Sequence, residues 1–557
     1  MYARRGFTSV FAATTLAIML GLGLVACGSS SSTGGTGSSG GGDLRIGIHL
    51  SIDSLNPFVA VQTSSIAVFE YIYPALVQYN TSLSIVPDFA TSWSESPNGL
   101  LWTFHTRPHA KWSDGRPLTA SDAAWTIDTA LKDGTGGAAE FAGYVAGVKS
   151  ATATTSDTLV VRMAAPQAAF LANIRQMPIL PEHVWSKYAT GKEGAGLRTY
   201  PNQPSSGHEV VSGGPFVCTQ YQHLGVALFE RNPVFYGPEP KIAGFGIQYF
   251  TSPDAELLAL KNGQIDAVWD VPPSGASSLR ADNSIVVHSQ LGLNAHDFIF
   301  NDYSKQTTDP ELALPTVHLA FDYAINRPEI IKDAFDGYAQ PASSPILAPT
   351  GRWHDPAIES PPFNLAKANQ LLDQAGFKNG SNGIRVADGH PMAYTVVLAA
   401  DELGAGSAAF QIIQTDFQKI GVRLTLDSVD DATAAGLELA PSTKFHIGMW
   451  GWTPPPDPNF MLNTYTCSQW GGWSETGFCD STYDHLYNEE AAETNPAKRL
   501  QMVYKMEELL AQKLPEIIYV DADWIDAWNN KWTGFGETPQ GFFTPLTTMG
   551  LLNVHQL

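Results

Sequence analysis

Strand patterns alternate with amphipathic helix patterns through much of this chain, which restricts it to α/β architectures. Residues 246–250 and 265–269 have the apolar character of strands, and a helix pattern lies between them. Ser252 suits the N-cap of that helix, Pro253 its first helical position, and Gly263 its end. This stretch therefore predicts one strand–helix–strand unit.

The second half of the chain repeats this pattern. Phe410, Ile413, Phe417 and Ile420 fall on one helical face. Strands are expected over residues 394–399, 422–427 and 445–450, and helices over 317–325, 327–335 and 364–375. Such alternation favours mostly open α/β sheets.

Composition and charge exclude several classes of protein. The chain has 557 residues, of which 44% are hydrophobic and 15% charged, too apolar for a disordered chain. At roughly 150 residues per domain, three or four domain-sized units are expected. The formal net charge of −22 argues against nucleic-acid binding and against adhesion to anionic membranes by charge. Only the N-terminus carries a long apolar segment, so a polytopic membrane protein is excluded.

Residues 1–27 have the pattern of an export signal. Arg4 and Arg5 precede an apolar stretch over residues 7–25, and the sequence LVAC ends at Cys27. This ending resembles a bacterial lipobox, which implies a signal peptide cleaved before a lipid-modified Cys27. A plain cleaved signal with an incidental cysteine is the alternative. The pair Arg4–Arg5 also partly resembles a twin-arginine signal, so the Sec and Tat routes both stay open.

A tether follows the leader. Residues 28–42 are Gly, Ser or Thr only, a composition that forms no core, and the tether is expected over 28–43. A tether is useful when its end is held, which favours a lipid anchor at the outer face of the cytoplasmic membrane. The folded part is expected from Leu44 onward, outside the cytoplasm.

Oxidising surroundings permit a disulfide. Cys467 and Cys479 lie close together in a Gly-, Trp- and Ser-rich segment, so we expect them to close a loop. Such a bond would contribute about 3 kcal/mol in the chain-entropy model. Cys218 is expected to be buried and unpaired. Zinc is the rival interpretation of the pair, but no Cys-x-x-Cys motif supports it, and no metal site is expected.

Enzyme signatures are missing from the sequence. It has no G-x-S-x-G elbow, no H-E-x-x-H motif and no phosphate-binding G-x-x-x-x-G-K-[ST] loop. Its histidines are scattered. We therefore expect no catalytic residue and no cofactor, although a triad set by geometry alone would leave no motif.

Six short blocks together resemble one known family, the extracytoplasmic solute-binding proteins of ABC importers. The relevant family is family 5, which binds peptides, nickel or oligosaccharides. The resemblance covers nearly all of the chain from Leu44 onward. In chain order the blocks are VPDFATSW (86–93) with WTF (102–104) and KWSDGRPLTASD (111–122), GGPF (213–216), ERNPVFY (230–236), KNGQID (261–266), AINR (324–327), and WGW (450–452) with PDP (456–458).

This resemblance implies a periplasmic-binding-protein-like fold of type II, with two α/β lobes that close on a ligand. Crossover strands would lie near residues 292–301 and 521–529. The implied division is 44–292 for the first lobe, with an extra subdomain at about 86–207, then 293–525 for the second lobe and 526–557 for the return to the first.

The implied function is capture of an extracellular solute by hinge closure, without breaking a bond. A membrane permease with its ATPase would receive the solute, and the protein would be a monomer. Ligand-binding positions implied by the motifs are Thr63, Ser64 and Ser65 in the first lobe and Trp450, Trp452 and Asp457 in a second-lobe loop. Each position also has a structural alternative. These are core packing for the tryptophans, a turn for Asp457, and capping of a helix near Ile66 by the hydroxyl residues.

Two departures from the family's dipeptide-binding members bear on the ligand. Those members carry an aspartate for the peptide's amino terminus, where this chain has Pro454, Pro455 and Pro456. They also carry an arginine for its carboxylate, but residues 399–410 contain no cation. An oligopeptide held mainly by its backbone is therefore expected. The alternative ligands are an oligosaccharide stacked on Trp and a metal chelate. The alternative functions are a secreted α/β hydrolase and a surface sensor or adhesin.

Overall fold

The computed structural model describes residues 43–557 except 61, 205–208, 304–308, 403 and 440–443. The predicted signal peptide, the lipobox Cys27 and nearly all of the tether lie outside these residues. Within the described part of the chain, no helix combines the length and the apolar character that a membrane span requires.

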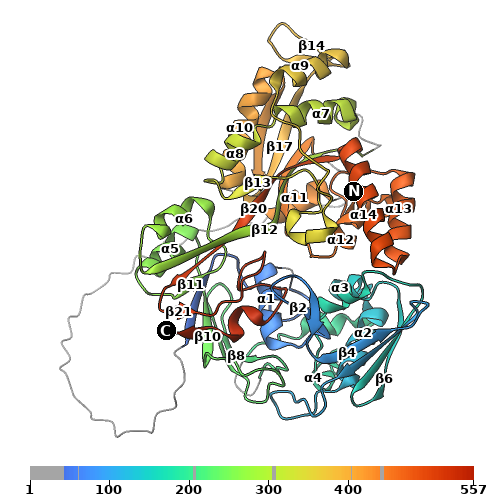
Figure 1. Ribbon diagram of the computed structural model, residues 1–557, viewed down its shortest axis with the longest axis vertical. Coiled ribbons are helices and arrows are strands. Elements are labelled where there is room, and N and C mark those ends of the chain that lie inside the picture. The colour runs from blue at the N-terminus through green and yellow to red at the C-terminus, as the bar shows by residue number, and fades with distance from the viewer. Residues whose placement is uncertain (1–42, 61, 205–208, 304–308, 403, 440–443) are drawn as a thin grey trace, which may run out of the picture. The chain divides into compact units, whose positions relative to one another are not determined.

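One large mixed sheet organises the chain (Figure 1). Its two longest strands, β12 and β20, pair antiparallel. They contain residues 292–300 of the first segment that was expected to cross between lobes and all of the second, 521–529. The strands in sheet order are β18 (Arg423–Val429), β17 (Ala393–Ala399), β19 (Ile447–Trp452), β12 (Ile285–Phe300), β20 (Glu516–Asn529), β11 (Ala267–Val268), β1 (Leu44–Ile48), β10 (Gly244–Tyr249), β9 (Val226–Arg231) and β8 (Phe216–Tyr221), with β13 (Ala339–Pro341) also paired to β20.

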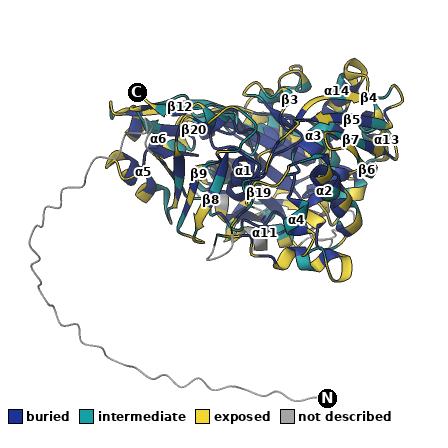
Figure 2. Ribbon diagram, turned by 90° about the horizontal axis from the view of Figure 1, so that it is seen from below, coloured by how far each residue is buried: buried dark blue, intermediate teal, exposed yellow. Residues whose placement is uncertain are grey.

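Two main hydrophobic cores lie along this sheet. One gathers residues from Leu44 to Trp269 together with residues from Trp524 to Val554, so the C-terminal segment packs against the N-terminal half of the chain. The other gathers residues from Phe298 to Ala522 and belongs to the second lobe. Figure 2 shows buried residues along the strands and exposed ones at turns and outer helix surfaces. The lobe boundaries themselves remain predictions.

A separate antiparallel sheet lies where the extra subdomain is expected. Its order is β4 (Ala90–Glu95), β5 (Leu101–Thr106), β7 (Thr158–Met163) and β6 (Val148–Thr155). Helix α2 (Ala120–Asp133) packs on β6 and begins with a capping box. Thr119 N donates to Asp122 Oδ2 at 2.9 Å, and Thr119 Oγ1 accepts from Ser121 N at 3.3 Å.

The first lobe also contains short helices and one small hairpin. Helix α1 begins at Thr63, three residues before the expected start, and its N-cap is Gln62. These elements are α1 (Thr63–Ile72), β2 (Val77–Tyr79), β3 (Ile85–Pro87), α3 (Phe170–Arg175), α4 (Glu182–Trp185), α5 (Pro253–Lys261), α6 (Pro273–Arg280), α15 (Met549–Leu552), and the paired strands β21 (Trp532–Thr533) and β22 (His555–Gln556).

In the second lobe, β17 pairs in parallel with both β18 and β19. The expected helices are all present. Asn326 and Asn364 cap α8 and α9 by accepting from Glu329 N and Lys367 N. The helices are α7 (Pro315–Ala324), α8 (Arg327–Asp333), α9 (Leu365–Gln374), α10 (Ala405–Lys419), α11 (Asp431–Glu438), α12 (Asn459–Thr464), α13 (Ser481–Ala492) and α14 (Pro496–Lys513).

One expectation about the second lobe was wrong. The WGW motif was expected in a loop after a strand over residues 445–450. Instead Trp450, Gly451 and Trp452 are the last residues of β19, opposite Asp297, His296 and Ala295 of β12. The strand is displaced because pairing with β12 sets its register, and a residue pattern alone does not reveal that partner.

Candidate functional site

The parallel strands of the first lobe end at one edge of the sheet. β1 pairs in parallel with β10 and β11, and His49 and Asp270 follow the ends of β1 and β11. His49 Nδ1 lies 3.0 Å from Glu256 Oε2, and its Nε2 lies 3.9 Å from Asp270 Oδ2. Burial lowers the pKa of His49, but the Glu256 hydrogen bond and both carboxylates outweigh it and raise that pKa. Ligands of open α/β sheets bind at such carboxyl ends.

Asp270 has a φ of +66°, in the left-handed region that non-glycine residues rarely adopt. Its main-chain N donates to Asp526 Oδ1 at 3.1 Å, which holds this conformation. Strained backbone of this kind is concentrated at binding sites. Removal from water raises the pKa of Asp270, whereas His49 and His296 act in the opposite direction.

The three hydroxyl residues predicted from sequence lie beside this edge. Ser64 Oγ donates to the Ser51 carbonyl at 2.5 Å, and Ser65 Oγ donates to Asp53 Oδ1 at 2.5 Å. Both serines are buried, whereas Thr63 is half-buried. None of the three is the N-cap of α1, so the capping alternative was wrong. The serines hold the loop that follows β1, and their contact with a ligand remains a prediction.

In the second lobe, Gly451 is required by close packing. A Cβ at this position would lie 2.7 Å from Glu402 Oε1 and 2.8 Å from the Ala295 carbonyl oxygen. Glu402 follows β17 at its carboxyl end and lies 2.7 Å from His296 Nδ1 of β12. The glycine between the two tryptophans therefore allows a buried His–Glu pair to sit against β19.

The two tryptophans of the motif have different surroundings. Trp450 packs against a small apolar cluster beneath α11. Trp452 Nε1 donates to Glu475 Oε2 at 2.9 Å, and its ring meets Phe460 and Trp473 edge-on at 5.9 and 6.2 Å. Trp473 is 51% exposed. These rings form a partly open aromatic surface.

Trp473 was missed by the sequence reasoning. It lies in the loop that the Cys467–Cys479 disulfide closes. The signal was present in the Gly- and Trp-rich composition between the two cysteines, but the ring's contact with Trp452 is long-range. Cys218, outside this pair, is free and buried, as expected.

Three buried carboxylates lie beneath Trp452. Oxygens of Asp297, Glu475 and Glu516 all lie within 4.8 Å of one another. Burial raises the pKa values of Asp297 and Glu475 well above their usual range and raises that of Glu516 to about 7. Neighbouring carboxylates raise the first two further. We call these three residues the acidic trio.

Asp457 is held in a buried ion network. Its two oxygens accept from Arg499 Nη2 and Nη1 at 2.7 and 2.8 Å, and Arg499 Nε donates to Glu490 Oε1 at 2.7 Å. Asp457 Oδ1 also accepts from Asn459 N at 3.0 Å, which is the expected turn contact. A ligand role for Asp457 remains a prediction.

A cavity of about 670 Å³ lies beside Asp457. The β2–β3 connection and α3 of the first lobe line it together with residues 349–353 and α14 of the second. The guanidinium carbons of Arg352 and Arg499 each lie 4.7 Å from the centre of the Trp353 ring. Arg352 is exposed, and no described carboxylate forms an ion pair with it. The cavity thus offers a cation and an aromatic ring, which sequence reasoning missed.

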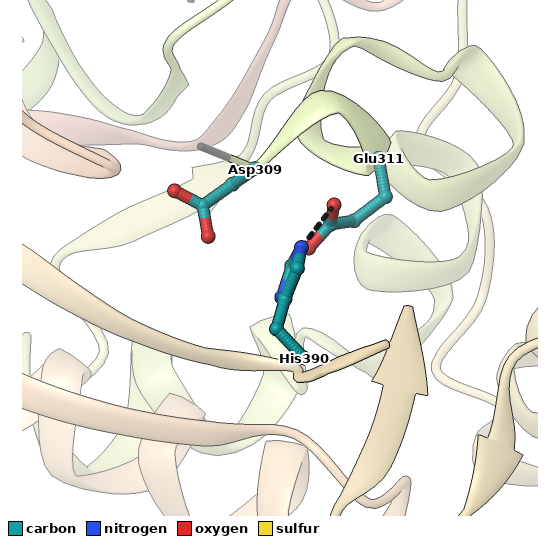
Figure 3. Close-up of side chains that lie close together, drawn as sticks. All are labelled: Asp309, Glu311 and His390. Atoms are coloured by element: carbon teal, nitrogen blue, oxygen red, sulfur yellow. Dashed lines mark ion pairs between the residues drawn. The ribbon is translucent and has the colours of Figure 1, made fainter. Parts of the chain in front are cut away.

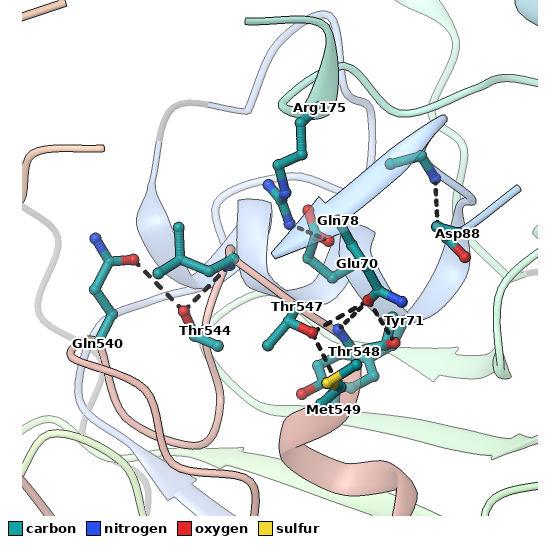
Figure 4. Close-up of polar contacts among 12 residues, drawn as sticks. Glu70, Tyr71, Gln78, Asp88, Arg175, Gln540, Thr544, Thr547, Thr548 and Met549 are labelled. Atoms are coloured by element: carbon teal, nitrogen blue, oxygen red, sulfur yellow. Dashed lines mark hydrogen bonds and ion pairs between the residues drawn. The ribbon is translucent and has the colours of Figure 1, made fainter. Parts of the chain in front are cut away.

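Polar contacts anchor the first-lobe side of this region (Figure 4). Arg175 of α3 pairs with buried Glu70 of α1 at 2.6 Å, and Gln78 Oε1 accepts from the Thr547 and Thr548 hydroxyls at 3.1 Å each. In the same C-terminal segment, Gln540 Nε2 donates to the Pro454 carbonyl at 3.4 Å. The C-terminal return thus contacts the proline segment that follows Trp452.

Comparison with known proteins identifies relatives across most of the chain. The family model "Bacterial extracellular solute-binding proteins, family 5 Middle" matches residues 84–473. An ABC transporter peptide-binding protein of Brucella ovis is 28% identical over 436 residues, 77% of each chain. The oligopeptide-binding protein OppA of Bacillus subtilis is 23% identical over 540 residues, 93% of this chain and 95% of that protein.

A solved structure with the same fold is AppA of Bacillus subtilis in complex with a nonapeptide. It superposes with a TM-score of 0.77 at 19% identity and covers 93% of this chain and 99% of that one. At this identity the likeness establishes the fold. The predicted two-lobed α/β class is confirmed.

Proposed function

Because the chain belongs to family 5 of the bacterial extracellular solute-binding proteins, we propose that it captures a peptide and delivers it to an ABC permease. Members of this family are extracytoplasmic binding proteins of transport systems and not enzymes. The names of the Brucella and Bacillus relatives support a peptide ligand. Hinge closure of the two lobes would exclude water from the bound solute.

The observation that carries the peptide proposal is the cavity lined by both lobes, with Arg352 at its wall. A buried peptide carboxylate needs a cation, and residues 399–410 supply none. Arg352 offers a guanidinium from a different segment, and the adjacent Trp353 ring offers apolar contact area. We assign Arg352 as the anchor of the ligand's carboxylate.

Replacing Arg352 by alanine is expected to weaken binding of a peptide with a free carboxyl terminus by about tenfold or more, because a charge-assisted hydrogen bond is lost. Binding is measured by calorimetry, with a first screen of peptides and oligosaccharides by thermal shift. Arg423→Ala removes an exposed arginine of β18 and is the matched control. The assignment would be contradicted if both variants lost the same affinity for the peptide. It would also be contradicted if the wild type bound a peptide with an amidated carboxyl terminus as tightly as one with a free carboxylate.

A second candidate ligand is an oligosaccharide. The partly exposed surface of Trp452, Phe460 and Trp473 favours it, because sugar rings stack on aromatic faces. In the screen, a melting shift with oligosaccharides and none with peptides would decide for this candidate. Thr63, Ser64, Ser65, Trp450, Trp452 and Asp457 remain our proposed ligand-proximal residues in either case.

We also propose that the mature protein begins at a lipid-modified Cys27, followed by the tether, and works as a monomer with a permease and its ATPase. The support is the lipobox pattern of the leader. Mass spectrometry of protein extracted from membranes is expected to show a diacylated N-terminal Cys27. Cys27→Ser is expected to release the protein into the soluble fraction. An unmodified N-terminus in membrane-extracted protein would contradict the anchor.

A further inference from the structure

We propose that the second lobe holds a divalent transition-metal ion of the zinc type, bound by Asp309, Glu311 and His390 (Figure 3). These residues lie at the amino-terminal end of β17, whereas Glu402 and the proposed ligand residues at the end of β19 lie at its carboxyl end. The proposed metal is therefore a structural ion, separate from the transported solute.

Glu311 is the central donor. It lies in the 3₁₀ turn Pro310–Ala313 and is 1% exposed. Its Oε1 accepts from the Tyr394 hydroxyl at 2.6 Å, whereas no described residue donates a hydrogen bond to its buried Oε2. A carboxylate buried to this extent needs a compensating cation.

His390 supplies the nitrogen donor. Its Nδ1 lies 3.5 Å from the Pro391 carbonyl oxygen, which can only accept, so this contact favours the tautomer with its proton on Nδ1. Nε2 then presents a lone pair, and it too has no hydrogen-bond partner among the described residues. Figure 3 shows this nitrogen directed at the Glu311 carboxylate.

The distance between His390 Nε2 and Glu311 Oε2 distinguishes a metal site from an ion pair. Nε2 and Oε2 are 3.5 Å apart. A charged N–H···O bond would bring such atoms to about 2.7–2.9 Å. Two ligands at about 2.0–2.1 Å from a tetrahedral zinc ion lie about 3.4 Å from each other. A ligand oxygen of Asp309 lies within 4.8 Å of both atoms. The spacing therefore fits an intervening ion.

Further residues orient the donors, as they do in established metal sites. His446 Nδ1 accepts from Thr395 N at 3.0 Å, so its proton is on Nε2, which faces Asp309 Oδ2 at 3.4 Å. His446 thus orients Asp309 and is not itself a ligand.

Three protein donors of mixed nitrogen and oxygen type leave one tetrahedral position for water. The ion would join the turn that precedes α7 to β16 (His390–Pro391), which pairs with β15 (Arg385–Ala387). These segments are far apart in the chain. The expected consequence is a more stable second lobe, because zinc would bind the folded arrangement only.

The test is calorimetric titration of chelator-treated, purified protein with zinc chloride, together with the melting temperature. Wild type is expected to bind zinc saturably and to melt at a higher temperature with it. The variants His390→Ala and Glu311→Gln are each expected to lose one equivalent of bound zinc, or to bind it at least about tenfold more weakly. Zinc is then expected to raise their melting temperature no longer. The control is His485→Ala, which removes an exposed histidine paired with Glu489 on α13.

Absence of saturable zinc binding by wild type would overturn the proposal. So would unchanged binding in both variants, or a loss in the His485 control equal to theirs. The His390 side chain is 32% exposed, so its variant is expected to fold even if Glu311→Gln does not. Peptide affinity measured alongside is expected to stay unchanged, which keeps this test independent of the ligand proposal.

Discussion

Replacement of Arg499 by alanine is expected to lower the free energy of unfolding by about 3–5 kcal/mol. Arg499 is 5% exposed and binds Asp457 through both terminal nitrogens and Glu490 through Nε. Burial lowers the pKa of Arg499, but these carboxylates outweigh it and raise that pKa, so the charge is held. Its loss would leave two carboxylates without a cation in a region of low solvent access.

Urea unfolding followed by circular dichroism measures this effect. Lys498→Ala is the matched control, because it removes an exposed cation from the preceding position of the same helix. That control is expected to change stability by less than about 0.5 kcal/mol. A similar small change for Arg499→Ala would show that water reaches Asp457 and Glu490 and replaces the cation.

The second large effect concerns pH and the acidic trio. Replacing Asp297 by asparagine is expected to make the protein lose less stability on going from pH 5 to pH 8 than wild type does. In the unfolded chain these carboxyls release their protons near pH 4. In the folded protein, burial raises the pKa of Asp297 well above its usual range, with further raising by Glu516 and Glu475.

The sign follows from proton binding. Between the unfolded and folded pKa values, the folded state holds more protons at these groups. The stability that the acidic trio contributes is therefore greatest at low pH and falls as the pH rises. The window opens at about pH 4 and closes near 7 for Glu516. For Asp297 and Glu475 it ends at folded pKa values well above their usual range. Each proton contributes a slope of about 1.4 kcal/mol per pH unit. Asparagine does not titrate, so the free energy of unfolding of the variant lacks the contribution of Asp297 to this pH slope.

Urea unfolding at several pH values between 5 and 8 gives the slopes. Asp427→Asn changes an exposed aspartate of β18 and is the control, with a slope expected to equal that of wild type. Equal slopes for wild type and Asp297→Asn would mean that Asp297 is ionised in the folded protein and that a cation or water compensates it.

Features that depend on neighbours in the chain were predictable from the sequence. Ser252 caps α5 as expected, Thr119 and Asp122 form a capping box, and Asn326 caps α8, because a cap is made within a few residues. The strand–helix–strand unit near residues 246–269 and the alternating elements of the second half followed from periodicity, and the family followed from short motif blocks. Cys467 and Cys479 are bonded, since a short loop needs little chain to close.

The tertiary structure alone decided which side chains meet. Asp457 pairs with an arginine 42 positions away, Trp473 contacts Trp452 from within the disulfide loop, and Arg352 lines the cavity from a separate turn. No periodicity or motif in the sequence encodes these contacts. They arise where the strands of one sheet end and where their connections fold back, and that depends on how the whole chain packs. Local sequence determined the elements and their caps, whereas long-range packing determined the chemistry of the site.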